Sequence, residues 1–417
     1  MTCASCSLGT HAPHSALVTA STVRFDLPGP LLAVAPRHVP CGSVTRVLHV
    51  SQPTEAGVAN VLLSLVKDQV ARGWEVHVAA PLEGHLLADA GAAHATTHHW
   101  AAVRSPGLST FFETLRLRQI VEAAQPDLVH LHSAKAGLAG RLAVRGSRQT
   151  IFQPHAWSFE AVTGSMKSAT REWERFARRW TDLTVCVSEA EMQMGRRERC
   201  LGRQSVVIPN GVDTDHWSPQ DRDAARRLVG IPVTGQVVVC VGRLSRQKGQ
   251  DVLLDAWPEV RRRFRSAHLY LVGDGPNRQE LESRQVPGIT LVGQAGPQPW
   301  LAAADVVVIP SRWEGMPLIL LEAMSSGRAV VAAHVNGTAE TLVDERLLVW
   351  PDDAADLTRA IADVLSDPSR RAELEEKNRE HAIAHLDVRR AAEATAVASQ
   401  SLKQHRQRQG PHGGLGC

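Results

Sequence analysis

The sequence predicts an α/β protein with two units, each built around a parallel β-sheet. Short apolar segments rich in valine, leucine and isoleucine alternate with segments of helical length, which is the pattern of parallel strands joined by helical crossovers. The alternation stops in a polar stretch at 215–232 and starts again near residue 237. A chain of 417 residues has room for two domains of ordinary size.

The first unit is expected to begin with a short buried strand at 46–51. A loop follows, and then a helix from Val58 to about Ala71, in which apolar residues recur at the spacing of one helical face. Gly73 ends this helix. Further apolar segments of the unit predict strands, some running into a loop, and they lie at 74–79, 127–132, 151–157, 184–189 and 206–213.

The second unit repeats this architecture without detectable sequence similarity to the first. It opens with a strand at 237–242, a loop at 243–249 and a helix at 250–263. Later apolar segments predict strands at 269–272, 291–293, 305–309 and near 330–331. Charged helices are expected from about 352 to 384, and the alanine-rich segment 389–403 predicts a final helix.

The chain is expected to divide into a disordered leader, two sheet domains, a final helix and a disordered tail. The expected bounds are 1–43, 44–215, 216–385, 386–404 and 405–417. The leader contains Cys3, Cys6, His11 and His14, whose spacing is too compressed for the usual zinc modules. A disordered leader is therefore favoured over a metal site.

Composition excludes several classes of function. A net charge of +3 is too small to indicate a nucleic-acid binder, and an aromatic content of 4% argues against stacking platforms for bases. Seven cysteines scattered along the chain do not form a disulfide pattern, so a reducing cytoplasm fits best. The sequence has no apolar run near the ~20 residues that span a bilayer and no secretory signal pattern.

The stretch 311–332 carries the most informative pattern. It follows a predicted strand and contains a tight loop and then a helix, with Pro317 in the first helical turn and Gly327 at the end. The free backbone N–H groups at such a helix start favour a phosphate. Glu314 and Glu322 could then bind a sugar and a ribose diol, because a carboxylate accepts both hydroxyl protons of a diol. Spacing alone leaves open that both are ordinary surface charges.

The loop 242–249 carries two candidate phosphate-binding cations, Arg243 and Lys248. An arginine can form a fork on phosphate oxygens while a lysine supplies a point charge. Taken alone, two basic residues in a loop are more often solvated. Gly273 lies in a tight turn after a strand, and Gly57 lies in a loop where a glycine lets backbone approach a ligand.

Histidines offer weaker signals. His155 lies at the carboxyl end of a predicted strand, the edge where open α/β sheets bind ligands, although a lone histidine is usually structural. His94, His98 and His99 are interpreted as loop or surface residues, since no acidic or cysteine ligand lies nearby in sequence.

The helix at 166–180 has an aromatic face and several arginines. It could lie on a membrane surface. Packing of its aromatic face on the sheet is favoured.

Glu314 and Glu322, with seven residues between them and with Gly315, Pro317 and Gly327 in place, resemble the donor-site signature of retaining glycosyltransferases of family GT4. The likeness extends over roughly residues 46–400. It implies a GT-B fold, in which two Rossmann-like domains face a central cleft and the final helix crosses back to the N-terminal domain.

The resemblance assigns roles to individual residues. It implies that the catalytic residues are Arg243, Lys248, Glu314 and His155. It implies that the donor-binding residues are Gly57, Gly242, Gly273, Gly315, Met316, Pro317, Leu318 and Glu322. It implies no metal site and no cofactor apart from the nucleoside diphosphate sugar that serves as donor.

The expected activity is transfer of a hexosyl group from a nucleoside diphosphate sugar to an acceptor hydroxyl with retention of configuration. A block from Lys135 to Arg141 resembles that of bacterial enzymes that build exopolysaccharide or envelope glycans, which implies a glycan or lipid-linked acceptor. We expect a cytoplasmic protein, which could contact the inner membrane peripherally, with no nucleic-acid partner.

The chain departs from the family pattern at two loops. Ala56 stands where a glycine is common, and 336–340 replaces the usual paired-glycine loop. Two other functions stay open. One is a GT-B epimerase or phosphorylase, although no pyridoxal-binding lysine is identified; the other is a non-catalytic nucleotide-sugar-binding subunit.

Overall fold

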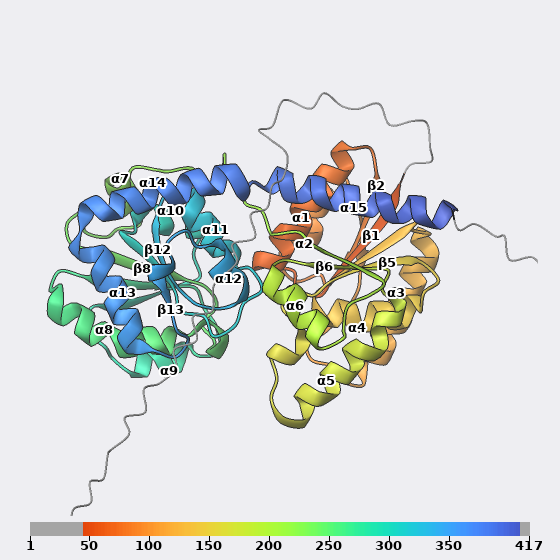
Figure 1. The fold of residues 1–417 in the computed structure, drawn as a ribbon, viewed down its shortest axis with the longest axis horizontal. Coiled ribbons are helices and arrows are strands. Elements are labelled where there is room, and N and C mark those ends of the chain that lie inside the picture. The colour runs from red at the N-terminus through yellow and green to blue at the C-terminus, as the bar shows by residue number, and fades with distance from the viewer. Residues whose placement is uncertain (1–44, 409–417) are drawn as a thin grey trace, which may run out of the picture. The chain divides into compact units, whose positions relative to one another are not determined.

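Two parallel β-sheets organise residues 45–408, which are the residues that the computed structural model describes. The predicted leader at 1–43 and residues 409–417 of the predicted tail lie outside the described residues. Each sheet has helices on both faces, and the chain completes the first sheet before it begins the second (Figure 1). The predicted α/β class with two parallel-sheet units is confirmed.

The first sheet has seven strands in the order β3-β2-β1-β4-β5-β6-β7, all parallel. The strands are β1 (Arg46–Ser51), β2 (Glu75–Ala80), β3 (Thr96–His99), β4 (Leu128–His132), β5 (Gln149–Gln153), β6 (Leu183–Cys186) and β7 (Gln204–Val207). The central strands are buried on both sides and are mostly apolar, as parallel strands between two helix layers must be, with histidines as the exceptions on β1 and β4. The direction of chain growth reverses between β1 and β4, and such a switch point leaves a crevice at the carboxyl ends of the strands.

Helices cover both faces of this sheet. They are α1 (Ala56–Ala71), α2 (Leu86–Ala92), α3 (Ser109–Ala124), α4 (Ser133–Val144), α5 (Gly164–Ala177) and α6 (Glu189–Arg197), with short 3-10 turns at Ser158–Glu160 and Arg178–Trp180. Leu62 and Val66 of α1 pack with Val47 on one face, whereas Leu117 of α3 packs with Leu48 on the other. The two cores therefore use alternate residues of the same strands.

The second sheet has six parallel strands in the order β10-β9-β8-β11-β12-β13. They are β8 (Val237–Val241), β9 (His268–Val272), β10 (Ile289–Gly293), β11 (Val306–Ile309), β12 (Ala329–Ala333) and β13 (Leu348–Val349). The switch point lies between β8 and β11. Their loops therefore meet at one place on the carboxyl edge.

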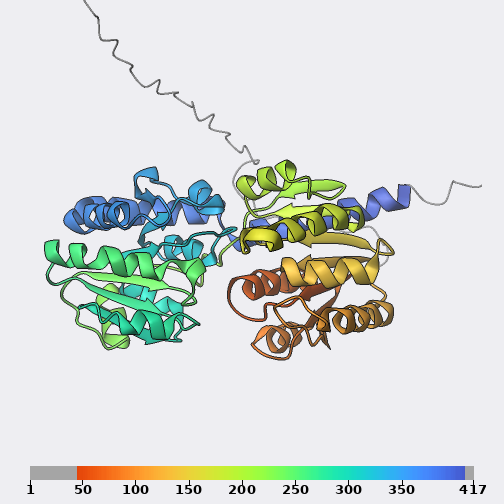
Figure 2. The same cartoon turned by 90° about the horizontal axis from the view of Figure 1, so that it is seen from below.

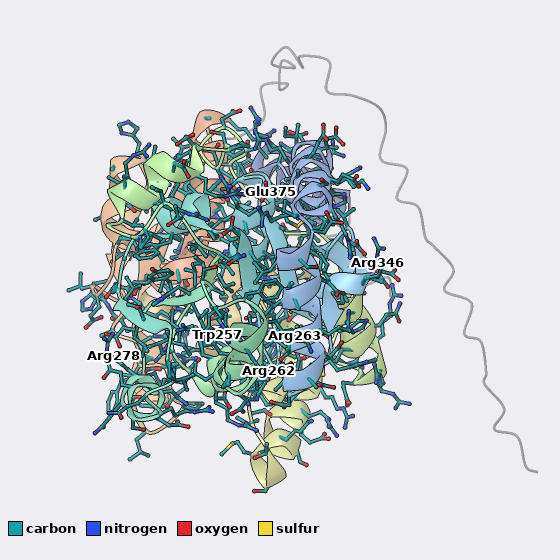
Figure 3. The ribbon with its side chains drawn as sticks, turned by 90° about the vertical axis from the view of Figure 1, so that its left-hand side faces the viewer. Trp257, Arg262, Arg263, Arg278, Arg346 and Glu375 are labelled. Carbon is teal, nitrogen blue, oxygen red and sulfur yellow. The ribbon has the colours of Figure 1, made fainter. Side chains whose placement is uncertain are left out.

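The helices of the second half are α7 (Arg222–Leu228), α8 (Gln250–Arg263), α9 (Arg278–Ser283), α10 (Pro297–Ala303), α11 (Leu318–Ser325), α12 (Asn336–Thr341), α13 (Ala354–Ser366), α14 (Pro368–His385) and α15 (Val388–Arg408), with 3-10 turns at Arg246–Lys248 and Glu345–Leu347. Helix α8 illustrates that one side of such a helix is buried and the other is exposed. Trp257 is fully buried, whereas Arg262 and Arg263 on the same helix lie at the surface and pair with Glu259 (Figure 3).

Two chain segments connect the halves, and they are bonded to each other. Val212 forms an isolated parallel bridge with Asp387, and the backbone N–H of Val388 donates to the carbonyl of Val212 at 2.9 Å. Gly211 has no space for a side chain, because an added Cβ would lie 2.4 Å from the Cα of Val388. The crossing segments are thus closely packed.

The last helix, α15, returns to the first half and packs beside α1 (Figures 1 and 2). Its Ala396 and Leu402 belong to the same core as the strands of the seven-stranded sheet. Lys403 pairs with Asp127 at 2.9 Å. The helix runs to Arg408, past the expected end at 404. Among the described helices, none is long and apolar enough to cross a membrane.

Three local expectations are wrong. Residues 336–340, expected as a loop, form most of the short helix α12. His98, expected in a loop or on the surface, lies in edge strand β3, where its ring contacts His77 at 2.9 Å. Pro317 lies just before α11 with an extended ψ of 124°, not in the first helical turn. The loop here stays extended for one residue longer than the proline pattern suggested.

The aromatic face of α5 also differs from the favoured interpretation. Glu174 and Ala177 are the buried residues of this helix, while Phe176 is 45% exposed and stacks against the Arg179 guanidinium. The physical reason is an ion pair: the Glu174 carboxylate reaches the buried Arg141 guanidinium at 2.7 Å. This contact turns the helix so that its acidic side, not its full aromatic face, points inward.

Candidate functional site

The predicted donor-site residues gather at the switch point of the six-stranded sheet. The loop after β8 and the loop after β9 pack together there: a Cβ added to Gly273 would lie 2.2 Å from the carbonyl oxygen of Gly242. Both glycines have positive φ, 154° at Gly242 and 135° at Gly273. A side chain at Gly273 would clash with the Gly242 backbone, and the positive φ of both residues favours glycine at each position.

The two loops of the motif are joined by an ion pair. The Lys248 ammonium lies 2.5 Å from the Glu314 carboxylate, and the Ser311 hydroxyl donates to the same oxygen at 2.8 Å. Gly249, directly after Lys248, has φ 67° and lies against the carbonyl of Pro310. Lys248 and Glu314 are 66 residues apart in sequence, and the fold brings them into direct contact.

Arg243 is different from Lys248. Its side chain is exposed, and its guanidinium has no hydrogen-bond or ion-pair partner within residues 45–408. The Gln250 amide donates a hydrogen bond to the Arg243 carbonyl oxygen at 3.1 Å. This bond fixes the backbone of the loop and leaves the guanidinium of Arg243 exposed. A second cation lies close by: burial, and then the charge of Arg243, lower the pKa of Arg104 in the other half of the chain. Such a pair of arginines is suited to an anion.

The start of α11 offers backbone donors beside these cations. Among the described residues, no acceptor engages the backbone N–H groups of Gly315 and Met316. The Met316 carbonyl accepts from the buried Asn210 amide at 2.8 Å, which fixes the loop from the crossing segment. Leu318, the first residue of α11, follows Pro317. These two N–H groups lie just before α11, which begins at Leu318, and an anion at this helix start stays a prediction.

Glu322 lies on α11 and is 8% exposed. Burial raises the pKa of its carboxyl group to about 7. Within the part of the chain that the structure describes, no hydrogen bond engages this carboxylate. Its oxygens are not among the described side-chain atoms that are closed off from solvent without a partner, so hydroxyl groups of a ligand can reach them as donors.

His155 approaches this site from the first half of the chain. It has φ 56°, and the next residue, Ala156, has φ 97°, so two successive non-glycine residues are left-handed, at a cost of about 1–3 kcal/mol each. Glu191 holds them in place, because its carboxylate accepts the backbone N–H of Ala156 at 2.7 Å and that of Val187 at 2.7 Å. A Cβ on Gly315 would lie 3.1 Å from the His155 carbonyl carbon. His155 therefore borders the donor loop.

Gly57 also borders α11. The nearest atom to a Cβ added at Gly57 is Cγ of Leu318, at 3.9 Å. Ala56 before it has φ 56°, the conformation that a glycine adopts without strain. Gly57, expected in a loop, lies in the first turn of α1, which begins at Ala56 and so starts two residues earlier than predicted.

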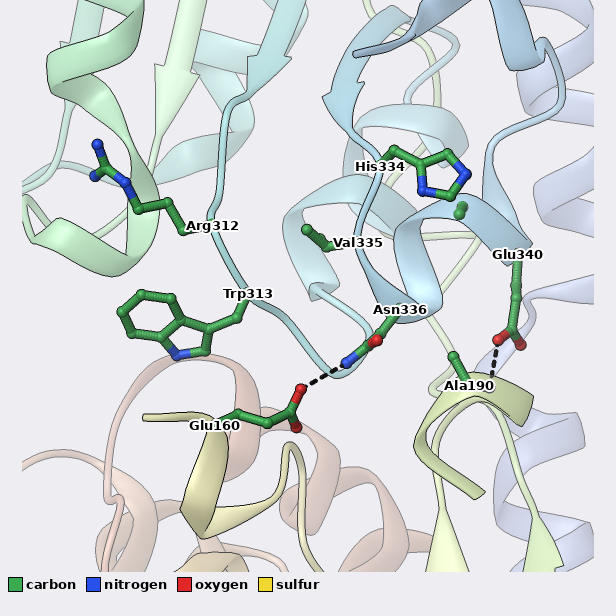
Figure 4. Close-up of a pocket in the computed structure, with 9 residues that line it drawn as sticks. Glu160, Ala190, Arg312, Trp313, His334, Val335, Asn336 and Glu340 are labelled. Atoms are coloured by element: carbon green, nitrogen blue, oxygen red, sulfur yellow. Dashed lines mark hydrogen bonds between the residues drawn. The ribbon is translucent and has the colours of Figure 1, made fainter. Parts of the chain in front are cut away.

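A pocket of about 370 Å³ lies where residues of both halves meet (Figure 4). Two hydrogen-bonded contacts hold its walls together. The Asn336 amide donates to Glu160 at 3.0 Å, and the Glu340 carboxylate accepts the backbone N–H of Ala190 at 2.6 Å. The second contact places a carboxylate at the positive N-terminal end of α6, where negative charge is stabilised.

This pocket adjoins the predicted diphosphate site without coinciding with it. Arg312 and Trp313, which precede Glu314, line the pocket, and Figure 4 shows the Trp313 ring at its edge. Arg243 and Lys248 are not among its lining residues. Its volume is within the ~300–1,000 Å³ of small-molecule sites.

Four residues of this region were not predicted as site residues: Arg104, Glu160, Glu191 and Glu340. Glu191 had a readable signal, because Ser188 and Glu191 have the spacing of a capping box, and Ser188 does cap α6 by accepting the Glu191 N–H at 3.1 Å. The other three had no signal, since each depends on a contact with the opposite half of the chain.

The two cations of the Lys135–Arg141 block are buried and paired within the first half of the chain. The Lys135 ammonium pairs with Glu113 at 2.6 Å, and both side chains are 3% exposed. The Arg141 guanidinium is fully buried, pairs with Glu174 and stacks on the Phe152 ring at 4.1 Å. These contacts fix how α4 packs.

Comparison with known proteins agrees with this architecture. A family profile described as "Glycosyltransferase Family 4" matches residues 56–216, and one described as "Glycosyl transferases group 1" matches residues 235–367. HepE from Anabaena, solved in complex with UDP and glucose, has a similar fold, with a TM-score of 0.74 over 86% of this chain and 100% of that chain. At 21% identity this likeness concerns the fold alone.

Two relatives illustrate the sequence similarity. The phosphatidyl-myo-inositol mannosyltransferase of Mycobacterium tuberculosis is 30% identical over 326 residues, which cover 74% of this chain and 82% of the relative. The UDP-Gal:alpha-D-GlcNAc-diphosphoundecaprenol alpha-1,3-galactosyltransferase of Escherichia coli is 29% identical over 54% of this chain. The chain spans 62% of the length of that relative and 52% of the length of the D-inositol 3-phosphate glycosyltransferase 2 of Catenulispora acidiphila. From the two profiles, the extended similarity and the two parallel-sheet halves, we conclude that the chain belongs to glycosyltransferase family 4 and has the GT-B fold.

Proposed function

We propose that this protein transfers a hexosyl group from a nucleoside diphosphate sugar to an acceptor hydroxyl, with retention of anomeric configuration. One observation carries the proposal. At a single switch point the chain presents the Lys248–Glu314 pair together with Arg243 and the largely buried Glu322, neither of which has a side-chain partner within residues 45–408. Two cations and two carboxylates in this order suit a ligand that has a diphosphate between a sugar and a ribose.

In this scheme Arg243 and Lys248 bind the diphosphate, and the backbone N–H groups of Gly315 and Met316 add two donors. These groups stabilise the negative charge that develops on the leaving diphosphate. Arg104 lies close enough to Arg243 to contribute from the other half. The scheme needs no metal ion, so turnover should be unchanged by EDTA.

The carboxylates bind the two sugars of the donor. Glu322 accepts hydrogen bonds from the ribose diol, and Glu314, held by Lys248 and Ser311, accepts from hydroxyls of the transferred sugar. His155 borders the same loop and contacts the donor sugar or the acceptor. Its role is tested by His155→Ala, which should lower turnover.

The chemical step exchanges one bond at the anomeric carbon for another. The bond from this carbon to the leaving phosphate oxygen breaks, and a bond to the acceptor oxygen forms on the same face of the sugar. The acceptor's hydroxyl proton passes to the departing phosphate oxygen. The products are a nucleoside diphosphate and the glycosylated acceptor, and no side chain has to act as the general base.

A lipid-linked or glycan acceptor is supported by the relatives. Their printed names include a galactosyltransferase for a diphosphoundecaprenol-linked sugar and a mannosyltransferase for phosphatidyl-myo-inositol. We therefore propose an acceptor of this class and envelope glycan assembly as its context.

Contact with a lipid surface is proposed at the start of α3. Leu108, Phe111 and Phe112 are 94%, 64% and 69% exposed, and Arg116 and Arg118 are exposed on the same helix. Apolar side chains next to arginines suit the surface of an anionic bilayer, where each basic residue contributes about 1 kcal/mol.

Sedimentation with vesicles tests this contact. A Phe111→Ser/Phe112→Ser variant should bind anionic vesicles less than the wild-type protein does. Leu228→Ser is the matched control, because Leu228 is 74% exposed on α7. Equal vesicle binding by all three proteins would remove the proposal for this surface.

The donor site is tested first by thermal shift. UDP, GDP, ADP and their sugars are compared in the presence of EDTA, on the wild-type protein and on Glu322→Ala. A ligand that binds the native state raises the melting temperature in proportion to its affinity and concentration. One nucleotide should stabilise the wild-type protein and not the variant.

Donor consumption with and without acceptor tests the chemistry separately. A donor that binds and is turned over only with an acceptor supports transfer. Binding without any turnover across an acceptor panel would instead favour a non-catalytic nucleotide-sugar-binding protein.

A further inference from the structure

A row of buried histidines lies at the switch point of the seven-stranded sheet. His49 on β1 is in register with His130 on β4, and His132 is two residues further along β4, so all three point to the same face. All three are fully buried. Gln69 of α1, 1% exposed, covers them from that face. A polar row at this place is unusual, because its neighbours on the strands are apolar core residues.

Three contacts join these side chains in series. Gln69 Oε1 lies 2.7 Å from His49 Nε2, and His49 Nδ1 lies 3.0 Å from His132 Nε2. His132 Nδ1 in turn lies 3.3 Å from His155 Nε2. The series runs from helix α1 through two strands to His155. His130 stacks on His132, with ring centres 4.1 Å apart, and so holds the plane of that ring.

The rings in this series are neutral. Burial lowers the pKa of His49 and of His155 to about 4, and burial together with the neighbouring rings lowers the pKa of His132 well below its usual value. A neutral imidazole has one N–H and one lone pair on its two ring nitrogens. A ring that donates a hydrogen bond to one neighbour must therefore accept one from the other, and this direction is passed along the series. With the Gln69 carbonyl oxygen as acceptor, each of the three rings carries its proton on Nε2.

A metal ion is the alternative explanation of such a cluster. One ring nitrogen each from His49, His130 and His132 lies within 4.8 Å of the others, and imidazole is a good ligand for zinc or copper. However, both ring nitrogens of His49 and of His132 already take part in the series. Only His130 has both nitrogens without a partner in the described part of the chain. An ion would have to break the series, so hydrogen bonding is favoured.

We propose that Gln69, His49 and His132 position His155 by fixing its proton on Nε2. His155 then presents the lone pair of Nδ1, so it accepts a hydrogen bond from a sugar or acceptor hydroxyl and does not donate one. Gln69, His49 and His132 are positioning residues, since they act through His155. The role of His155 in binding rests on the proposed function, whereas its tautomer is a property of the protein without any ligand.

Nitrogen NMR of the full-length protein with 15N-labelled histidine measures the tautomer directly. In the wild-type protein His49, His132 and His155 should all carry the proton on Nε2. Gln69→Leu removes the terminal acceptor and His49→Phe interrupts the series. In each variant His155 should lose its single tautomer and give signals of both forms. If one variant does not fold, the other still gives the answer.

The sheet contains a matched control. His77 and His98 form a similar pair, at 2.9 Å, but their series ends at Glu75 and does not reach His155. His98→Gln should therefore leave the His155 tautomer unchanged. A wild-type His155 protonated on Nδ1, or a His155 tautomer unaffected by both Gln69→Leu and His49→Phe, would overturn the proposal. So would a stoichiometric metal ion in protein purified without chelators.

Kinetics separate positioning from a general structural effect. Gln69→Leu should lower kcat at least twofold and leave the KM for the donor unchanged, and it should cause no further loss in a His155→Ala background. An equal loss in both backgrounds would mean that Gln69 does not act through His155. If no nucleotide sugar is turned over at all, the proposed function fails while the NMR result still decides the tautomer.

Discussion

Both halves of the chain carry cations in the segment that follows a strand bordering the switch point, β4 in the first sheet and β8 in the second. After β4, Lys135 and Arg141 are buried and paired with Glu113 and Glu174. After β8, Arg243 is exposed and has no partner in the described residues. A positive charge placed after a strand at the switch point therefore does not by itself make a residue ligand-binding. A cation whose charge is already matched inside the protein supports the fold, and one whose charge is unmatched is available to a ligand.

The largest expected effect is on the stability of the first half. Glu174→Ala leaves the buried Arg141 charge without its partner, which should lower the free energy of unfolding by about 3–5 kcal/mol. Urea denaturation measures this change. Glu172→Ala is the control, because Glu172 is 69% exposed and pairs with Arg175 at the surface, so its loss should cost under about 1 kcal/mol. Equal effects of the two variants would show that burial does not distinguish the pairs.

The second effect is on turnover in the other half. Arg243→Ala should lower kcat by about 10²–10³-fold, the cost of removing one group that stabilises developing negative charge. The melting temperature should hardly change, because the side chain is exposed and makes no ion pair among the described residues. Arg265→Ala is the control: Arg265 is exposed in the turn before β9, at the opposite edge of the sheet. Near-normal turnover by Arg243→Ala would remove the contrast with Arg141.

The third effect concerns the pH dependence of donor binding. The Glu322 carboxyl group has a pKa of about 7, and it must be ionised to accept two hydroxyl protons. Donor affinity should therefore fall as the pH drops through 7, by about tenfold between pH 8 and pH 6. Titration calorimetry with a nucleoside diphosphate sugar measures it. Glu322→Gln should bind weakly with no such dependence, and an identical pH profile in that variant would assign the titration to another group.

The smallest effect is expected at Ala56, the first residue of α1. Ala56→Gly relieves a left-handed alanine, but it also increases the entropy of the unfolded chain, so the net gain in stability should be below about 1 kcal/mol. Thermal unfolding measures it, with turnover as a second readout. A clear destabilisation would mean that the Ala56 methyl group packs against the loop in a way that its exposure does not suggest.

The sequence predicted the second half of the site better than the first. Lys248 and Glu314 lie in the loops after β8 and β11, and Glu322 lies on the helix that follows the second loop. Each strand-loop-helix context is local, and the strand order brings the two together at one switch point. The tight turn at Gly273 was likewise local. Local motifs of this kind can be predicted from the sequence without knowing which strands are neighbours in the sheet.

The side-chain contacts of the first half could not be predicted from local motifs. The series from Gln69 to His155 depends on the register of β1 against β4, and the pairs of Lys135 and Arg141 depend on helices far along the chain. The buried face of α5 differs from the predicted one for the same reason, since the ion pair with Arg141 decides it and the aromatic spacing does not. A buried charge takes its meaning from its partner, and sequence spacing does not name that partner.

The paired crossing segments and α15 have a consequence for how the chain could be divided. The two halves are joined by non-covalent contacts as well as by the covalent chain. These contacts include the bridge between Val212 and Asp387 and the packing of Leu402 in the first core. A gene split at the exposed stretch near Asp221 should thus yield two fragments that reassemble, the second fragment docking through its own terminal helix. Co-purification of separately tagged fragments is the expected sign, and it should disappear when the second fragment ends before Asp387.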